Sequence, residues 1–257
     1  METKSLGFIG GGRVTKIFLQ ALANKEIDLS SIIVCDTNDE VLITLKKLFP
    51  AIQTTDSSNL TAKQNIVFIA LHPPVIMETL ESIKEVVSEN TQIVSLAPKI
   101  SIEKIIIKLG VKSIARMIPN ATSYINEGYN PICFSDEYSK IEKQAIRDLL
   151  TLLGNTFEVD ESKLEAFAMI SAMLPTYFWF QWKEIQKIGE QMGLDQLESK
   201  KAIQDTLIAA INLYFDSELS DNEVIDLIPV RPIGENESQI SEIYQSKLMG
   251  LFQKIKP

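Results

Sequence analysis

Short apolar runs alternate with amphipathic stretches of helical period between residues 4 and 135. Runs that are apolar throughout indicate strands buried on both faces of a parallel sheet, and their alternation with helices is typical of a doubly wound α/β fold. The predicted strands are residues 5–10, 31–36, 65–70, 92–96 and 113–117. One predicted helix follows the first strand and ends at residue 23, and three more cover residues 40–48, 74–88 and 101–109. We therefore predict a Rossmann-type sheet, to which residues 130–134 add an edge strand before a helix over 139–153.

The pattern changes near Gly154 and is helical from Glu161 on. A long helix is predicted over residues 162–192, and Pro175 should kink it because proline lacks a backbone donor. Two further helices are predicted over residues 196–215 and 238–254.

The two patterns divide the chain into a Rossmann-type domain over residues 1–157 and an all-α domain over 158–257. Residues 164–182 are apolar on nearly every side, which indicates a helix covered all round. A domain of this size supplies only part of that cover. We therefore expect the all-α domain to form a homodimer interface.

Composition excludes several kinds of site and partner. The 257 residues include one histidine, His72, which excludes a zinc or iron site built from several imidazoles, so no metal is expected. The two cysteines, Cys35 and Cys133, form neither a disulfide framework nor a C-x-x-C site, and we expect a cytoplasmic protein. The net charge of −9 argues against nucleic acid as a partner. No apolar stretch reaches the roughly 20 residues that a bilayer requires, so no membrane partner is expected.

A glycine-rich loop follows the first predicted strand and opens the first predicted helix. Gly10 and Gly12 fit the dinucleotide fingerprint G-x-G-x-x-G, with Gly11 between them and Thr15 in the third position. The first glycine permits a tight turn, and the second lets backbone amides approach a pyrophosphate at the helix N-terminus. This context predicts a dinucleotide site, and the alternative is a flexible glycine turn.

Asp36 ends the second predicted strand, where a carboxylate is placed to bond the ribose hydroxyls of NAD. The alternative is an aspartate that caps a strand or helix. Thr37 and Asn38 are placed to bond a 2′-phosphate, although no arginine stands at positions 37–40. NAD is therefore favoured, and NADP stays open.

Three further segments resemble the pyrroline-5-carboxylate reductase family. Residues 70–74, ALHPP, resemble its A-V-K-P-x segment. Residues 116–122, RMIPNAT, with Glu127 and Gly128 after them, resemble R-x-M-P-N-T-P…E-G. Residues 171–177, SAMLPTY, resemble S-G-S-G-P-A-Y. Order and spacing agree from about residue 5 to 215, so the chain resembles this family over most of its length.

The resemblance implies a homodimer that interlocks through the helical domain. It also implies hydride transfer from NAD(P)H to the carbon–nitrogen double bond of a small cyclic imino acid. The cofactor contacts that it implies are Gly10, Gly12, Arg13 and Val14 at the pyrophosphate, Ala70, Leu71 and Pro73 beside the nicotinamide, and Asn120 near its ring.

The substrate side departs from the family pattern. Ala172, Met173 and Leu174 stand where the family has glycine, serine and glycine. The family's S-P-G-G-T-T segment, which cradles the substrate carboxylate, has no match after Phe215. Arg231 is placed either to bind a substrate carboxylate or to form a surface ion pair. We therefore expect reduction of a small imine or carbonyl whose identity stays open.

His72, Ser171 and Thr176 are the candidate catalytic residues. His72 lies on a strand-end loop, and an imidazole with a pKa near 6.5 is suited to proton donation. The alternative is a histidine that packs on the adenine or contacts solvent. The hydroxyls of Ser171 and Thr176 are placed to orient the substrate or relay a proton, and the alternative for both is helix packing.

Two other functions compete with imine reduction. A β-hydroxyacid dehydrogenase uses a helical lysine followed one turn later by asparagine, but none of Lys163, Lys183 and Lys187 has asparagine four positions on. A non-catalytic nucleotide-binding sensor or scaffold is the second alternative, because Ala172 and Leu174 fill positions that are glycine in the family.

Overall fold

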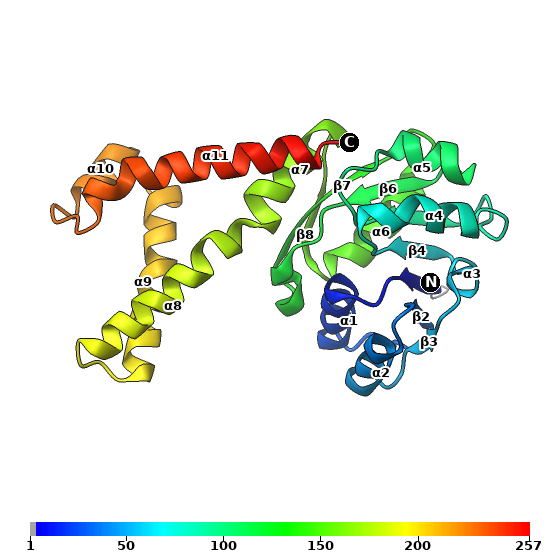
Figure 1. Cartoon of the computed structure of the whole chain (residues 1–257), viewed down its shortest axis with the longest axis horizontal. Helices are drawn as coiled ribbons and strands as arrows, with labels where there is room; N and C mark the ends of the chain where they lie inside the picture. The colour runs from blue at the N-terminus through cyan, green and yellow to red at the C-terminus, as the bar shows by residue number, and fades with distance from the viewer. Residues whose placement is uncertain (1–3) are drawn as a thin grey trace. The chain divides into compact units, whose positions relative to one another are not determined.

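A computed structural model describes residues 4–257 (Figure 1). Its centre is one eight-stranded sheet with the order β3-β2-β1-β4-β5-β6-β7-β8. The strands are β1 (Leu6–Ile9), β2 (Ile32–Cys35), β3 (Gln53–Thr55), β4 (Ile66–Ile69), β5 (Gln92–Ser95), β6 (Ile114–Met117), β7 (Gly128–Phe134) and β8 (Gly154–Glu158). The first six strands are parallel and follow the order of the dinucleotide-binding fold, so the predicted doubly wound sheet is confirmed.

The far side of the sheet differs from the prediction. β7 is not an edge strand: it pairs antiparallel with β6, as at Met117 and Ile132, and parallel with β8. The two edge strands, β3 and β8, were not predicted. Both have mixed, partly exposed residues because one side of each is open, and therefore neither forms an apolar run.

Aromatic packing fixes the first helix, α1 (Arg13–Asn24), over the middle of the sheet. The ring of Phe18 packs edge-on against Phe8 of β1 and Phe68 of β4, with centroid distances of 5.6 and 5.2 Å. Phe8 and Phe68 stack on each other at 4.7 Å. This cluster anchors α1 beside the point where the strand order reverses.

Short capped helices complete the sheet-containing part of the chain. They are α2 (Asp39–Leu48), α3 (Ser58–Thr61), α4 (Pro73–Ile83), α5 (Ile102–Leu109) and α6 (Lys140–Thr151), with the 3-10 helices η1 (Ala121–Ile125) and η2 (Glu161–Lys163). α4 and α5 pack side by side (Figure 1). α6 begins with a capping box in which Ser139 and Glu142 satisfy each other's backbone amides.

The long helix predicted over residues 162–192 is interrupted. After η2 come α7 (Leu164–Phe167), a π-helical turn η3 (Ala168–Ala172) and α8 (Leu174–Gln191). Pro175 lies in the first turn of α8, where a missing N–H breaks no helical hydrogen bond. The predicted kink at Pro175 is therefore replaced by a break just before it.

Contacts divide the chain into two compact units, one ending at Ala172 and joined by residues 252–257, the other covering residues 173–251. The second unit holds α8, α9 (Gln196–Asp216), α10 (Asp221–Asp226), η4 (Gly234–Asn236) and most of α11 (Glu237–Ile255). α9 and α11 match predicted helices, whereas the short α10 was not predicted. The functional boundary placed after residue 157 stays a prediction.

Candidate functional site

Five loops meet at the carboxyl edge of the parallel strands. Ligands of open α/β sheets bind at this edge, where the strand order reverses, and here the reversal lies between β1 and β4. The loops are residues 10–12 after β1, 36–38 after β2, 70–72 after β4, 96–101 after β5 and 118–120 after β6. The structure thus brings all of the predicted cofactor-binding segments to one edge.

Gly10 is required by both conformation and space. Its φ of +104° lies in the left-handed region, and its N–H donates to the Cys35 carbonyl at 2.8 Å. A Cβ at this position would lie 2.4 Å from the carbonyl oxygen of Ala70, which is the first residue after β4. The tight turn therefore depends on glycine, as the fingerprint predicts.

Gly12 stands open at the start of α1. It has an ordinary φ of −71°, and a Cβ built there meets no atom within 4 Å. As N-cap residue it gives the helix no side-chain hydrogen bond. The first amides of α1 therefore point into open space with the positive end of the helix dipole, which is the arrangement that binds a phosphate.

Thr15, which stands in place of the third glycine, stabilises the glycine-rich loop by a hydrogen bond. It is fully buried, and its hydroxyl donates to the Gly10 carbonyl at 2.5 Å. Arg13 is exposed in the first turn, and Val14 is half-buried against the core.

Asp36 links the glycine loop to the loop after β2. Its Oδ2 accepts the Gly11 N–H at 2.7 Å and its Oδ1 accepts the Asn38 N–H at 2.9 Å. Asp36 does not cap α2, because Asn38 accepts the Glu40 N–H at 2.9 Å and takes that role. Each carboxylate oxygen keeps a second lone pair, so Asp36 both orders the loop and can accept from a ribose hydroxyl.

The loop after β4 forms the other wall. Ala70 and Leu71 are half-buried, and α4 begins at Pro73. His72 is the exposed N-cap of that helix, and its imidazole makes no capping hydrogen bond. His72 thus lies at the carboxyl edge of the strands, and its catalytic role stays a prediction.

Asn120 is buried, and its side chain forms hydrogen bonds within the loop that contains it. Its Oδ1 accepts the Thr122 N–H at 3.0 Å and caps η1, so this oxygen orders the loop after β6. Its backbone N–H donates to Oδ1 of Asn130 at 3.3 Å, and Oδ1 of Asn130 also accepts from Ser123 at 3.2 Å. Sequence reasoning missed Asn130, although a polar residue inside the apolar run of β7 was a usable signal.

The two hydroxyl candidates are engaged within their own helical turns. Ser171, in η3, donates to the Phe167 carbonyl at 2.7 Å. Thr176 donates to the Met173 carbonyl at 2.6 Å. Ser171 belongs to the sheet-containing unit and Thr176 to the helical unit. Both oxygens can still accept a hydrogen bond, and their catalytic roles stay predictions.

Arg231 forms the surface ion pair that the sequence left open. Its Nη2 donates to both carboxylate oxygens of Glu237 at 2.6 Å, and both side chains are about half exposed.

Within the described residues, no helix combines the length and apolar character needed to cross a bilayer. Those residues also contain no group of histidine, cysteine and carboxylate side chains placed to hold a metal ion.

Comparison with known proteins agrees with this geometry. Residues 5–99 match the family described as NADP oxidoreductase coenzyme F420-dependent. The pyrroline-5-carboxylate reductase of Haemophilus influenzae is 26% identical over 218 residues, which cover 83% of this chain and 79% of that protein.

Solved structures give the same relation. The pyrroline-5-carboxylate reductase of Coxiella burnetii superposes with a TM-score of 0.73 at 24% identity, covering 99% of this chain and 95% of the other. The pyrroline carboxylate reductase of Plasmodium falciparum, with NADP bound, gives a TM-score of 0.77 at 19% identity, covering 99% of this chain and 95% of the other. The resemblance carried by the three sequence segments is therefore confirmed.

Proposed function

We propose that this chain, a divergent relative of the pyrroline-5-carboxylate reductases and an NAD(P)-dependent oxidoreductase, transfers a hydride to the carbon of a small imine. The observation that carries the proposal is the uncapped start of α1, which follows Gly10 and Gly12 at the reversal point of the sheet. A second support is the order and spacing of the three segments that resemble the family.

The residues at the carboxyl edge fit a nicotinamide dinucleotide. The amides of residues 10–14 would hold the pyrophosphate, and Asp36 would accept from the adenosine ribose. Asn120, together with the loop over 70–73, would hold the nicotinamide end. When bound, the dinucleotide supplies the hydride, and the protein aligns the acceptor. A carboxylate at position 36 repels a 2′-phosphate, so we expect tighter binding of NADH than of NADPH.

The proposed substrate is a small imine or carbonyl, because the segments on the substrate side differ from the family pattern. The bulky Ala172-Met173-Leu174 stretch replaces the small family residues, and Arg231 is already paired with Glu237. The Ser171 hydroxyl, which donates to the Phe167 carbonyl, would accept a hydrogen bond from an iminium N–H, and Thr176 is the second candidate for that role. A substrate that arrives protonated needs alignment more than an acid.

We also propose a cytoplasmic protein that forms a homodimer through its helical unit. Its helices leave large apolar side chains exposed, among them Trp179 at 48%, Phe180 at 67% and Phe215 at 74%. Apolar surface on this scale favours a protein partner, and a second copy of the chain is the partner that we propose.

The proposal is tested with purified protein, NADH, NADPH and two imines. The nucleotides are titrated first, and 1-pyrroline-5-carboxylate or uncharged 1-pyrroline is then added while the nicotinamide absorbance is followed. We expect saturable nucleotide binding and turnover of at least one imine. Binding without turnover of either imine contradicts the proposed reaction, and failure to bind either nucleotide contradicts the proposed site.

A further inference from the structure

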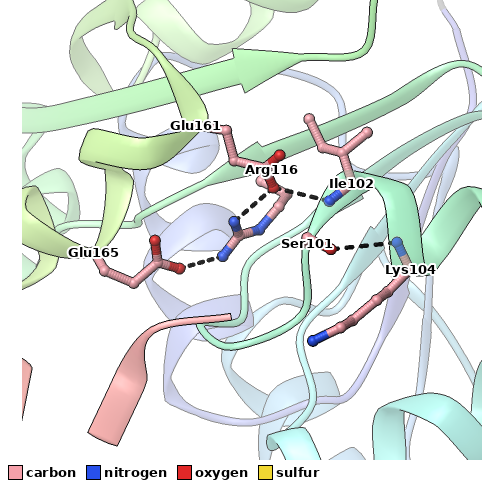
Figure 2. A network of polar contacts seen from close by, with 6 residues as sticks. All are labelled: Ser101, Ile102, Lys104, Arg116, Glu161 and Glu165. Carbon is pink, nitrogen blue, oxygen red and sulfur yellow. Dashed lines mark hydrogen bonds and ion pairs between the residues drawn. The ribbon is translucent and has the colours of Figure 1, made fainter. Parts of the chain in front are cut away.

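A buried ion network joins three elements of the sheet-containing unit (Figure 2). At its centre is Arg116 of β6, whose side chain is fully buried. Its Nη1 donates to Oε1 of Glu161 at 2.7 Å, and its Nη2 donates to Oε1 of Glu165. Glu161 begins η2 and Glu165 lies in α7, where its side chain is only 3% exposed. One guanidinium therefore connects the sheet to the chain that precedes η3.

The network also reaches a fourth element, α5. The same Oε1 of Glu161 accepts the N–H of Ile102, the first residue of α5, at 2.8 Å. Ser101 caps this first turn of α5 by accepting the Lys104 N–H at 3.3 Å (Figure 2). Arg116 of β6 thus binds two carboxylates of the helical segment after β8. One of these carboxylates, Glu161, also binds the first amide of α5.

Stability alone explains such a network poorly. Buried ion pairs lose much of their Coulomb attraction to desolvation, and apolar residues of similar volume often replace them without loss of stability. The planar guanidinium instead imposes direction, because its fork fixes where both carboxylates lie.

The two ends of the network lead to predicted site residues. β6 carries Arg116 and continues into the loop that contains Asn120. α7 carries Glu165 and continues into the π turn η3, where Ser171 donates to the Phe167 carbonyl at 2.7 Å. π turns inside helices are frequently found at functional sites.

We propose that Arg116, Glu161 and Glu165 are positioning residues that set the Ser171 turn in register with the Asn120 loop. The inference rests on the proposed function, in which both segments border the nicotinamide and the imine. The network holds the acceptor at the distance and angle that hydride transfer requires, and it touches neither substrate nor cofactor itself.

The first test is Glu165→Gln, which keeps the shape of the side chain and removes its charge. We expect faster amide hydrogen exchange at residues 118–122 and 168–172, with exchange in β1 and α1 unchanged. This readout needs no substrate, so it decides the inference even when the proposed reaction is wrong. Unchanged exchange in both segments overturns it.

The second test measures the hydride-transfer step and applies when the wild type reduces an imine. In Glu165→Gln we expect kcat to fall about 10- to 100-fold and the isotope effect from deuterated NADH to rise, because misalignment slows the hydride transfer itself. The dissociation constant for NADH should stay within about twofold, because the pyrophosphate loop lies on β1. Glu158→Gln, which removes an exposed partner of Lys143 and Arg147, is the matched control and should leave all three values unchanged.

A double variant separates positioning from stability. Arg116→Met with Glu165→Met removes the charges that face each other and leaves Glu161 on the amide of Ile102. We expect a Tm near that of the wild type together with the low kcat and raised isotope effect. A folded double variant with wild-type kcat and isotope effect overturns the inference. If this variant fails to fold, Glu165→Gln decides by the same criteria, measured per folded molecule.

Discussion

Gly10 and Gly12 stand two positions apart and have opposite requirements. Gly10 needs a left-handed backbone beside the carbonyl of Ala70, whereas Gly12 has an ordinary backbone and free space around its Cα. A fingerprint match assigns both residues to the cofactor and does not separate them. The geometry does, because one residue holds the turn and the other keeps room for a ligand.

Substituting the two glycines should therefore give different defects. Gly12→Val should fold with a near-normal Tm and bind NADH at least about 100-fold more weakly, because its side chain fills the space before the α1 amides. Gly10→Ala should lose about 2–3 kcal/mol of stability through left-handed strain and the clash with Ala70. Thermal unfolding and nucleotide titration distinguish the two. A Gly12→Val protein that binds NADH normally contradicts the placement of the pyrophosphate.

Lys99 carries local strain at the same edge of the sheet. Its φ of +75° is in the left-handed region, which costs a non-glycine residue about 1–2 kcal/mol. Lys99→Gly should raise the free energy of unfolding by up to about 1 kcal/mol, since the flexibility of glycine in the unfolded chain offsets part of the gain. Lys84→Gly, at a φ of −51°, is the control and should lower stability. Urea unfolding measures both.

The buried thiol of Cys133 in β7 should lower the free energy of unfolding as the pH becomes alkaline. Burial raises the pKa of its thiol from 9.0 to about 12. The folded state therefore keeps a proton that the unfolded state releases, so this stabilisation is complete below about pH 9 and is lost as the pH rises toward 12. The slope is about 1.4 kcal/mol per pH unit. Urea unfolding of the wild type should weaken more steeply between pH 9 and 11 than that of Cys133→Ala, and equal slopes contradict the assignment.

At the scale of elements, the buried parallel strands could be predicted from sequence because both of their faces are apolar. The edge strands β3 and β8 could not, since a strand with one open side mixes polar and apolar residues. The break at η3 was also missed. The apolar period continues through residues 162–192, and only the backbone reveals the π turn that separates α7 from α8.

For the candidate site, the local motifs could be predicted from sequence, whereas the long-range ion pairs could not. Gly10, Gly12, Asp36 and the Asn120 loop carry signals that are local in sequence, and the structure gathers them at one edge. The pairing of Arg116 with Glu161 and Glu165 depends on contacts between segments far apart in the chain. Nothing in the spacing of these residues indicated that they would meet.

Helix α8 approaches α9 closely at a glycine. A Cβ on Gly189 would lie 2.8 Å from Oγ of Ser199 and 3.6 Å from the side chain of Leu194. Gly189→Leu should therefore force the two helices apart at a cost of about 1–3 kcal/mol. Hydrogen exchange of α8 and α9 should rise in this variant. Gly250→Leu, where a Cβ meets no atom within 4 Å, is the control and should leave exchange in α8 and α9 unaffected.

At the scale of the whole molecule, the proposed homodimer follows from where the apolar surface lies. The helical unit exposes aromatic side chains, whereas the parallel strands of the other unit bury theirs. Phe180→Glu should convert a dimer into a monomer while leaving NADH binding largely intact, because the dinucleotide loops belong to the sheet-containing unit. Light scattering after gel filtration measures the mass. A wild type that is monomeric at micromolar concentration contradicts the proposed dimer.

The return of residues 252–257 to the sheet-containing unit has a consequence for synthesis. The ribosome completes β1 to η3 first, then makes the helical unit, and only afterwards releases Phe252 and the buried Ile255. The sheet-containing unit therefore completes its packing only after residues 252–257 have emerged, even though most of its residues emerge earlier. The helical unit, whose sequence lies between these two segments, is made before those last contacts can form.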